Sequence, residues 1–126
     1  MKNRKKLADA EWEIMNGIWH FKKPVTVREM HAHLYPKGEK AYTTVQTIMN
    51  ILVEKKFLRK DKIGMVNFYF PIVAYEDFTR QETRTLVSRI FDGSFGALAT
   101  YLVDSGELSQ EELIQLKALI NSKKKE

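Results

Sequence analysis

One stretch, AYTTVQTIMNILVEKKFL at residues 41–58, constrains the fold more than any other part of the chain. Its apolar residues recur at i, i+3, i+4 and i+7, which places them on one face of an α-helix: Val45, Ile48, Met49 and Leu52. The opposite face carries short, uncharged hydrogen-bonding groups that suit base edges in a DNA major groove. An ordinary amphipathic helix with a solvated polar face has the same pattern, so the neighbouring segments must decide between the two.

Two shorter helices are expected before this stretch. The first begins near Asp9, and its large apolar residues recur at helical spacing: Trp12, Met15, Ile18 and Trp19. The second begins with the capping-box sequence T-x-x-E at residues 26–29 and is closed by Pro36 and Gly38. The link of residues 35–40 has about the length found between the helices of a helix-turn-helix pair.

Beyond residue 58 the apolar period changes from helical to two, because Val66, Phe68 and Phe70 alternate with polar or smaller residues. Residues 58–62 can pair with them as a hairpin with lysines at or near its tip. Three helices followed by a basic hairpin form the layout of a winged helix. In that fold the third helix enters the major groove and the hairpin, or wing, lies along the DNA backbone or minor groove.

The rest of the chain predicts three further helices. Asp92-Gly93 separates the first two, and a second capping box, S-x-x-E at residues 109–112, begins the third. Their apolar stripes are too short for an independent core, so we expect the same elements of a second subunit to cover them. Folding back onto the winged helix in a monomer is the alternative. The residues assigned to the dimer contact are Leu86, Ile90, Phe95, Leu98, Leu102, Leu113, Leu116 and Ile120.

The sequence therefore predicts a mainly α protein with a small β-hairpin, in two parts. Residues 1–73 form a winged helix-turn-helix DNA-binding domain, and residues 74–126 form a C-terminal helical dimerisation domain. The first part carries 14 Lys and Arg against 7 Asp and Glu, whereas the second carries 7 against 9. A basic first part joined to a slightly acidic second part suits a head that binds a polyanion and a separate tail.

Several classes of function find no support in the sequence. The chain has no cysteine, which excludes disulfides and thiolate metal sites. No run of about 18 apolar residues is present, so we expect a cytoplasmic protein with no membrane insertion. There is no glycine-rich phosphate loop and no G-x-S-x-G motif. His31 and His33 are two apart on a helix and cannot share a metal ion. We therefore expect no enzyme activity, no cofactor and no metal.

The residues expected to bind double-stranded operator DNA come from the third helix, the link before it and the wing. Gln46 and Asn50 are the best candidates for reading bases, because an amide can pair with adenine at two places. Tyr42 and the lysines would contact phosphates, which fixes register without specifying sequence. The full set is Lys40, Tyr42, Thr43, Thr44, Gln46, Thr47, Asn50, Lys60 and Lys62.

In their order along the chain these segments resemble the penicillinase-repressor family, the BlaI/MecI group, which also includes copper-responsive CopY-type repressors. LADAEWEIMNGIW at 7–19 is similar to the family's opening helix, and TVQTIMNILVEKKFL at 44–58 to its recognition helix. Residues 26–30 resemble its second helix. The wing is matched by Lys62, Gly64, Tyr69 and Pro71, and the dimerisation segment by Gly93, Phe95 and LSQEEL at 108–113.

The resemblance implies a homodimeric repressor that binds an inverted-repeat operator over a promoter, for genes such as those that answer a cell-wall antibiotic. In that family a membrane sensor protease acts indirectly, by triggering cleavage of the repressor within its dimerisation helices. This chain departs from the pattern at several positions. The family's Asn-Phe cleavage pair is replaced by Tyr101-Leu102, and the tail cysteines of the copper branch are absent.

Three further departures concern the DNA-binding part. The family usually has a basic residue where Ile51 and Met65 stand, and glycine where Lys56 stands. Losing two cations should remove phosphate contacts, each changing the salt dependence of binding by about one unit. These departures give weight to an alternative function, a winged-helix protein–protein interaction module without sequence-specific DNA binding. A small enzyme or ligand-binding domain is a further alternative and would need a deep polar pocket.

Overall fold

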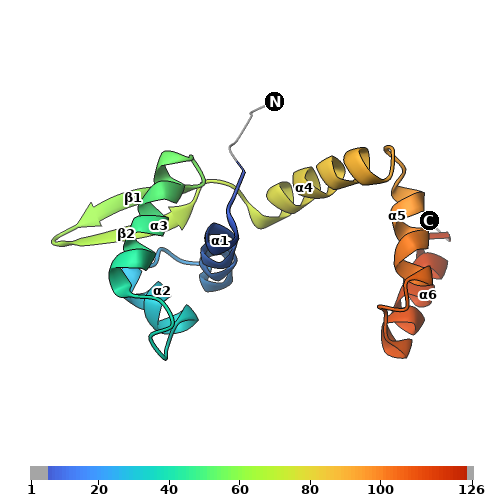
Figure 1. Cartoon of the computed structure of the whole chain (residues 1–126), viewed down its shortest axis with the longest axis horizontal. Coiled ribbons are helices and arrows are strands. Elements are labelled where there is room, and N and C mark those ends of the chain that lie inside the picture. Colours follow the sequence, from blue (N-terminus) through green and yellow to red (C-terminus); the bar gives the residue numbers. More distant parts are fainter. Residues whose placement is uncertain (1–5, 125–126) are drawn as a thin grey trace. The chain divides into compact units, whose positions relative to one another are not determined.

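The computed structural model describes residues 6–124, which form six helices and one antiparallel hairpin. The elements, shown in Figure 1, are α1 (Asp9–Phe21), α2 (Val27–Leu34), α3 (Tyr42–Glu54), β1 (Leu58–Ile63), β2 (Val66–Pro71), α4 (Tyr75–Ile90), α5 (Phe95–Asp104) and α6 (Gln110–Lys124). The expected mainly helical fold with one hairpin is confirmed. The chain divides into two compact units, which meet between Phe78 and Thr79.

The second helix begins as the T-x-x-E sequence predicts. The backbone N–H of Thr26 donates to Glu29 Oε1 over 2.9 Å, and the backbone N–H of Glu29 donates to Thr26 Oγ1 over 3.1 Å. Two donors that the first turn of α2 leaves without helical partners are thereby satisfied. The link to α3 is held by His31, whose Nε2–H donates to the backbone carbonyl of Lys40 over 2.7 Å. The start of α2 and the link to α3 are therefore both fixed by hydrogen bonds.

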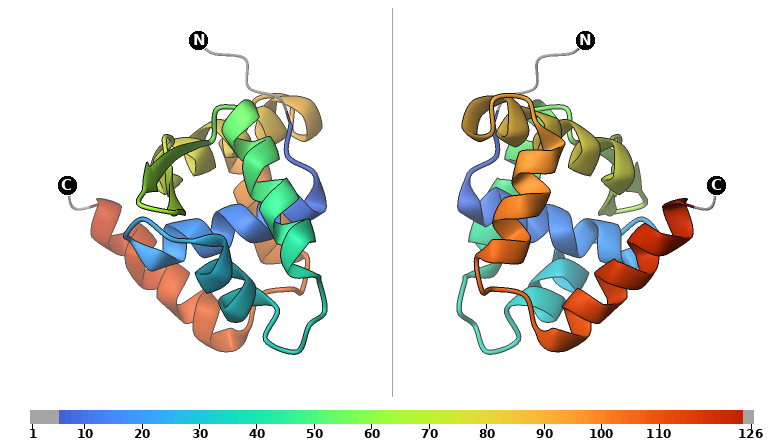
Figure 2. Two further views of the ribbon diagram at one scale, coloured as in Figure 1. Left: turned by 90° about the vertical axis from the view of Figure 1, so that its left-hand side faces the viewer. Right: turned by 90° about the vertical axis from the view of Figure 1, so that its right-hand side faces the viewer.

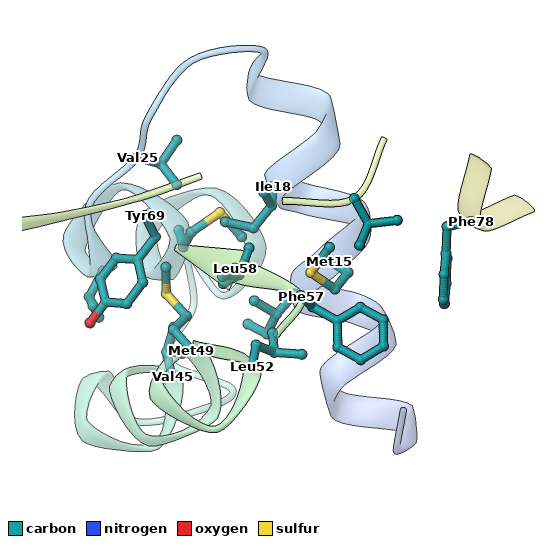
Figure 3. Close-up of a cluster of buried hydrophobic side chains, with 14 of the residues drawn as sticks. Met15, Ile18, Val25, Val45, Met49, Leu52, Phe57, Leu58, Tyr69 and Phe78 are labelled. Carbon is teal, nitrogen blue, oxygen red and sulfur yellow. The ribbon is translucent and has the colours of Figure 1, made fainter. Parts of the chain in front are cut away.

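The apolar edge of α3 lies in the core of the first unit. Val45, Met49 and Leu52 have no exposed surface, and Ile48 is partly buried against them. The same cluster holds core residues of α1 and α2, namely Ile14, Met15, Ile18 and Met30. Figure 3 shows Met15 and Ile18 beside the residues of α3. Figure 2 shows α3 lying across α1. Burial of each such side chain contributes about 1.5–3 kcal/mol, so this edge fixes the orientation of α3.

The hairpin is joined to the core by Tyr69. In the register of β1 and β2, Lys60 lies opposite Tyr69 and Leu58 opposite Pro71, and this face of the hairpin turns toward the helices at its base. Tyr69 is 1% exposed, and its backbone exchanges two hydrogen bonds with Val25. The alternating residues that revealed the strand, including Phe68, lie on the other face because side chains alternate along a strand. The turn of the hairpin projects beyond the helices (Figure 1).

The first turn of α4 belongs to the first unit through Phe78. This ring lies 5.0 Å from Trp12, 5.5 Å from Trp19 and 5.5 Å from Phe57, measured between ring centroids. Trp19 also donates its Nε1–H to the backbone carbonyl of Val73 over 2.9 Å. Both tryptophans therefore serve as packing anchors. The domain boundary expected at residues 73/74 remains a prediction. In the structure the contacts of Phe78 place the first turn of α4 in the first unit, which ends at Phe78.

The second unit has helices but little core. Asp92 and Gly93 adopt left-handed backbone angles where the break after α4 is expected. Ser94 caps α5 by accepting from the backbone N–H of Ala97, and Ser109 exchanges capping bonds with Glu112 before α6. Among the described residues of this unit, only Val87 is buried. No helix in the described part of the chain is long and apolar enough to cross a membrane.

A left-handed residue after α3 leads to a first prediction. Lys56 has φ of 71°, a conformation that costs a residue with Cβ about 1–2 kcal/mol relative to glycine. Lys56→Gly should therefore raise the free energy of unfolding by about 1 kcal/mol in urea titrations. Lys56→Ala is the control, because it removes the lysine side chain but keeps Cβ. An equal gain from both variants would show that the backbone strain is not the cause.

A second prediction concerns the ion pair that joins α3 to α1. Lys55 Nζ lies 2.7 Å from Glu11 Oε1, and the Glu11 side chain is 9% exposed. Burial raises the pKa of Glu11, but hydrogen bonds from Lys55 and the Ala8 backbone N–H outweigh it and leave the pKa below its ordinary value of 4.5. The pair therefore stabilises the fold above about pH 4.5, and this contribution is lost as the pH falls through the lowered pKa.

Lys55→Met should lower the free energy of unfolding at pH 7 by about 1–3 kcal/mol, because Glu11 is left buried without its cationic partner. At a pH below the lowered pKa of Glu11 the variant and the parent chain should approach equal stability, since Glu11 is then protonated in both. Urea titrations at the two pH values measure this difference. A stability gap that does not change with pH would contradict the assigned role of the pair.

Candidate nucleic-acid interface

The N-terminal half of α3 presents a polar surface. Tyr42 is 44% exposed, and the other residues predicted on this face are also exposed: Thr43, Thr44, Gln46 and Thr47. The face forms because the apolar residues of α3 are drawn to α1 and α2, which leaves the opposite side to solvent. Thr47 Oγ1 donates back to the carbonyl of Thr43 over 2.9 Å, so its hydroxyl retains lone pairs toward solvent.

Asn50 lies on the same helix one turn further but is half-buried. Its Oδ1 accepts hydrogen bonds from Lys60 Nζ at 3.1 Å and from Tyr69 Oη at 3.0 Å. Burial raises the pKa of Tyr69, and the neighbouring Tyr42 hydroxyl raises it further. The Tyr69 hydroxyl therefore stays protonated near neutral pH and remains a donor. Of the two amides expected to read bases, Gln46 is exposed and Asn50 is held by the hairpin.

The predicted lysines lie around this helix. Lys60 and Lys62 point from the same strand face and are exposed, although Lys60 is tied to Asn50. Lys40, in the link before α3, is half-buried with its Nζ 5.5 Å from the centre of the Tyr35 ring. The cations therefore lie at both ends of the polar face, which is the arrangement needed to bind backbone phosphates on either side of an inserted helix.

A groove of about 590 Å³ runs between the start of α2, the start of α3 and β2. Tyr42 and Gln46 line it from α3, and Thr26 and Arg28 line it from α2. Arg28 and Asn67 are polar lining residues that were not predicted from the sequence. The sequence did place Arg28 in the first turn of a capped helix, which could have marked it as a candidate to bind phosphate. Only the tertiary fold, however, brings that turn beside β2.

The residues predicted for the dimer contact carry apolar surface that the second unit itself does not cover. Leu98 and Leu113 are half-buried. The others are exposed by 38–68% of their surface: Leu86, Ile90, Phe95, Leu102, Leu116 and Ile120.

In the part of the chain that the structure describes, no group of three or more His, Asp or Glu side chains could hold a metal ion.

A comparison with protein families identifies the family of this chain. Residues 7–122 match the family model described as penicillinase repressor. This chain belongs to the penicillinase repressor family. The methicillin resistance regulatory protein MecI of Staphylococcus aureus strain N315 is 26% identical, and the match covers 93% of this chain and 94% of that protein. The penicillinase repressor of Staphylococcus aureus is 25% identical over 89% and 88% of the two chains.

Two solved structures resemble the first unit of this family member. The solution structure of the DNA-binding domain of the repressor BlaI matches with a TM-score of 0.52 and 30% identity, over 61% of this chain and 93% of that one. The monomeric form of Bacillus licheniformis BlaI in complex with the blaP half-operator matches with a TM-score of 0.51 and 30% identity, over the same shares. The winged-helix fold of the DNA-binding part is therefore confirmed.

The departures from the penicillinase repressor pattern have clear structural positions. Lys56, where the family usually has glycine, has the left-handed angle described above. Met65, where the family usually has a basic residue, lies in the hairpin turn and is 90% exposed. Ile51 is half-buried on the side of α3. In this family member the turn of the wing is thus apolar. The lysines of the wing, Lys60 and Lys62, lie in β1 before the turn.

Proposed function

We propose that this member of the penicillinase repressor family is a transcriptional repressor that binds an inverted-repeat operator as a homodimer. Each subunit inserts α3 into the major groove of one half-site. The observation that carries the proposal is the exposed amide and hydroxyl face at the start of α3, flanked by exposed lysines of the wing. The related BlaI of Bacillus licheniformis, solved as a monomeric form in complex with the blaP half-operator, supports one subunit per half-site.

The side chains divide between sequence reading and backbone binding. Gln46 reads a base, because its amide is exposed on α3 and can pair with adenine in two places. Thr43, Thr44 and Thr47 contact bases or nearby phosphates. The phosphates on either side are bound by Lys40, Tyr42, Lys60 and Lys62. Arg28 joins this set, since it lines the groove between α2 and β2 in which one DNA strand would lie.

Dimerisation through the tail accounts for the exposed apolar residues of α4, α5 and α6. A two-fold axis brings the same surface of both subunits together, so the protein symmetry matches an inverted repeat. The half-sites then lie about one helical turn of DNA apart, or a multiple of it. Repression follows by competition, because the dimer and RNA polymerase cannot occupy the promoter together. A membrane sensor protease that acts indirectly on the repressor would relieve it.

Selection from a random duplex library tests the proposal, with the DNA upstream of the chain's own gene as a second probe in mobility-shift assays. We expect an enriched inverted repeat and an affinity that falls steeply with salt. Binding that is equally weak for all duplexes would contradict the repressor assignment. It would favour the alternative, a winged helix that serves as a protein–protein interaction module.

Gln46→Ala supplies the prediction for base reading. The variant should lose about 1–3 kcal/mol of discrimination at one base pair in each half-site, while its fold stays intact because Gln46 is exposed. Affinities for a set of operators with single base-pair changes measure the loss. An equal drop for every operator would mean that Gln46 contacts only the backbone.

Ile90→Asp supplies the prediction for the dimer. Ile90 is 68% exposed in the single chain, so the charge should not disturb the fold but should disrupt a subunit contact. Sedimentation should show a monomer, and operator binding should weaken at least tenfold, roughly the effect of losing 1.4 kcal/mol. Ser88→Asp is the control, because it adds the same charge on the opposite side of α4. A dimer that survives Ile90→Asp would remove α4 from the interface.

A further inference from the structure

The carbonyl oxygen of Asn50 is shared by two donors from the hairpin. Lys60 Nζ lies 3.1 Å from Asn50 Oδ1, and Tyr69 Oη lies 3.0 Å from the same atom. Lys60 and Tyr69 are direct cross-strand partners, so their side chains leave the same face of the hairpin. Asn50 therefore joins α3 to both strands of the wing through a single atom.

The chemistry of the partners fixes the orientation of the amide. A lysine ammonium has donors and no acceptor, so it must face the oxygen of Asn50 and not the nitrogen. The Tyr69 hydroxyl is the second donor. An amide oxygen has two lone pairs, and these two bonds use both of them. Only the N–H groups of the Asn50 amide remain for a further partner.

This arrangement conflicts with adenine reading by Asn50. Two-point pairing with adenine needs the amide oxygen to accept from the adenine amino group while the amide N–H donates to the ring nitrogen. The oxygen is already occupied. Lys60, in contrast, keeps two N–H donors after bonding Asn50, and these lie beside the exposed face of α3.

The residue beneath this cluster, Tyr69, is held in place by burial and by its backbone hydrogen bonds. Tyr69 is 1% exposed, and its backbone N–H and carbonyl bond Val25 over 2.7 and 2.9 Å. Lys60 is an exposed side chain on a flexible four-carbon stem, which would otherwise sample many positions. Asn50 accepts a hydrogen bond from each of these side chains, and it thereby holds the Lys60 ammonium in a fixed position relative to Tyr69.

We propose that Asn50 is a positioning residue, which fixes the wing against α3 and directs the Lys60 ammonium to one backbone phosphate instead of reading a base. The inference rests on the proposed DNA binding. It separates the two amides of α3 by role: Gln46 specifies sequence, whereas Asn50 sets the geometry in which the wing binds phosphate.

A double-mutant cycle on the selected operator tests the role. Lys60→Met should weaken binding about tenfold and lower the slope of log affinity against log salt concentration by about one. In the Asn50→Ala background the same substitution should cost roughly threefold or less, because the ammonium is no longer directed. Lys62→Met is the matched control: this lysine lies two residues nearer the turn on the same face and should cost the same factor in both backgrounds. Equal effects of Lys60→Met in both backgrounds would overturn the proposal.

Operators with single base-pair changes separate positioning from base reading. Asn50→Ala should weaken binding to all of them by one common factor, so that the sequence preference is retained. Loss of preference at one base pair would assign Asn50 to direct reading and overturn the proposal. Tyr69→Phe is the second variant, since it keeps the buried ring and removes only the hydroxyl that holds Asn50. It too should leave the preference unchanged while weakening binding.

Hydrogen exchange measured in the absence of DNA tests the link between Asn50 and the wing independently of the proposed function. In the free chain, backbone amides of the hairpin should exchange several-fold faster in Asn50→Ala and in Tyr69→Phe than in the parent, and Lys62→Met should leave them unchanged. Unchanged exchange in both of the first two variants would refute the link between Asn50 and the wing. A parent chain that selects no duplex would refute the proposed function alone.

Discussion

Burial of one edge of α3 is the constraint on which the rest of the structure depends. Val45, Met49 and Leu52 are fully buried against α1 and α2, and Tyr69 closes the same core from the hairpin. Because the apolar edge can face only inward, the threonine hydroxyls and the Gln46 amide of α3 face solvent. The wing is held to the same core through Tyr69, so the helix and the wing share one rigid base.

Much of this arrangement could be predicted from local sequence signals. The capping boxes at Thr26 and Ser109 marked helix starts because Ser or Thr followed by Glu three residues later satisfies backbone donors within a single turn. The helical spacing of Val45 and Met49 predicted which side of α3 is buried. The change to a period of two predicted the hairpin. Each of these signals depends on residues that are neighbours in sequence.

The parts that escaped prediction depend on residues far apart in the chain. Nothing near Asn50 in the sequence indicates that Lys60 and Tyr69 occupy its carbonyl oxygen, because only the register of β1 and β2 brings them together. The groove beside Arg28 likewise requires β2 to lie next to the start of α2. Alternation identified the strand but could not say which face meets the core. In the structure that face is the one that carries the buried side chains of Leu58 and Tyr69. The family resemblance anticipated the fold and leaves these local roles open.

The chain lacks cysteine, which makes the exposure of α3 directly measurable. Thr47→Cys introduces a single thiol at the centre of the polar face, and its rate of alkylation reports whether that face is free. We predict rapid alkylation of the free chain and strong protection by the operator duplex but not by a duplex of unrelated sequence. Slow alkylation of the free chain, or a rate that the operator leaves unchanged, would contradict the claim that this face of α3 meets DNA.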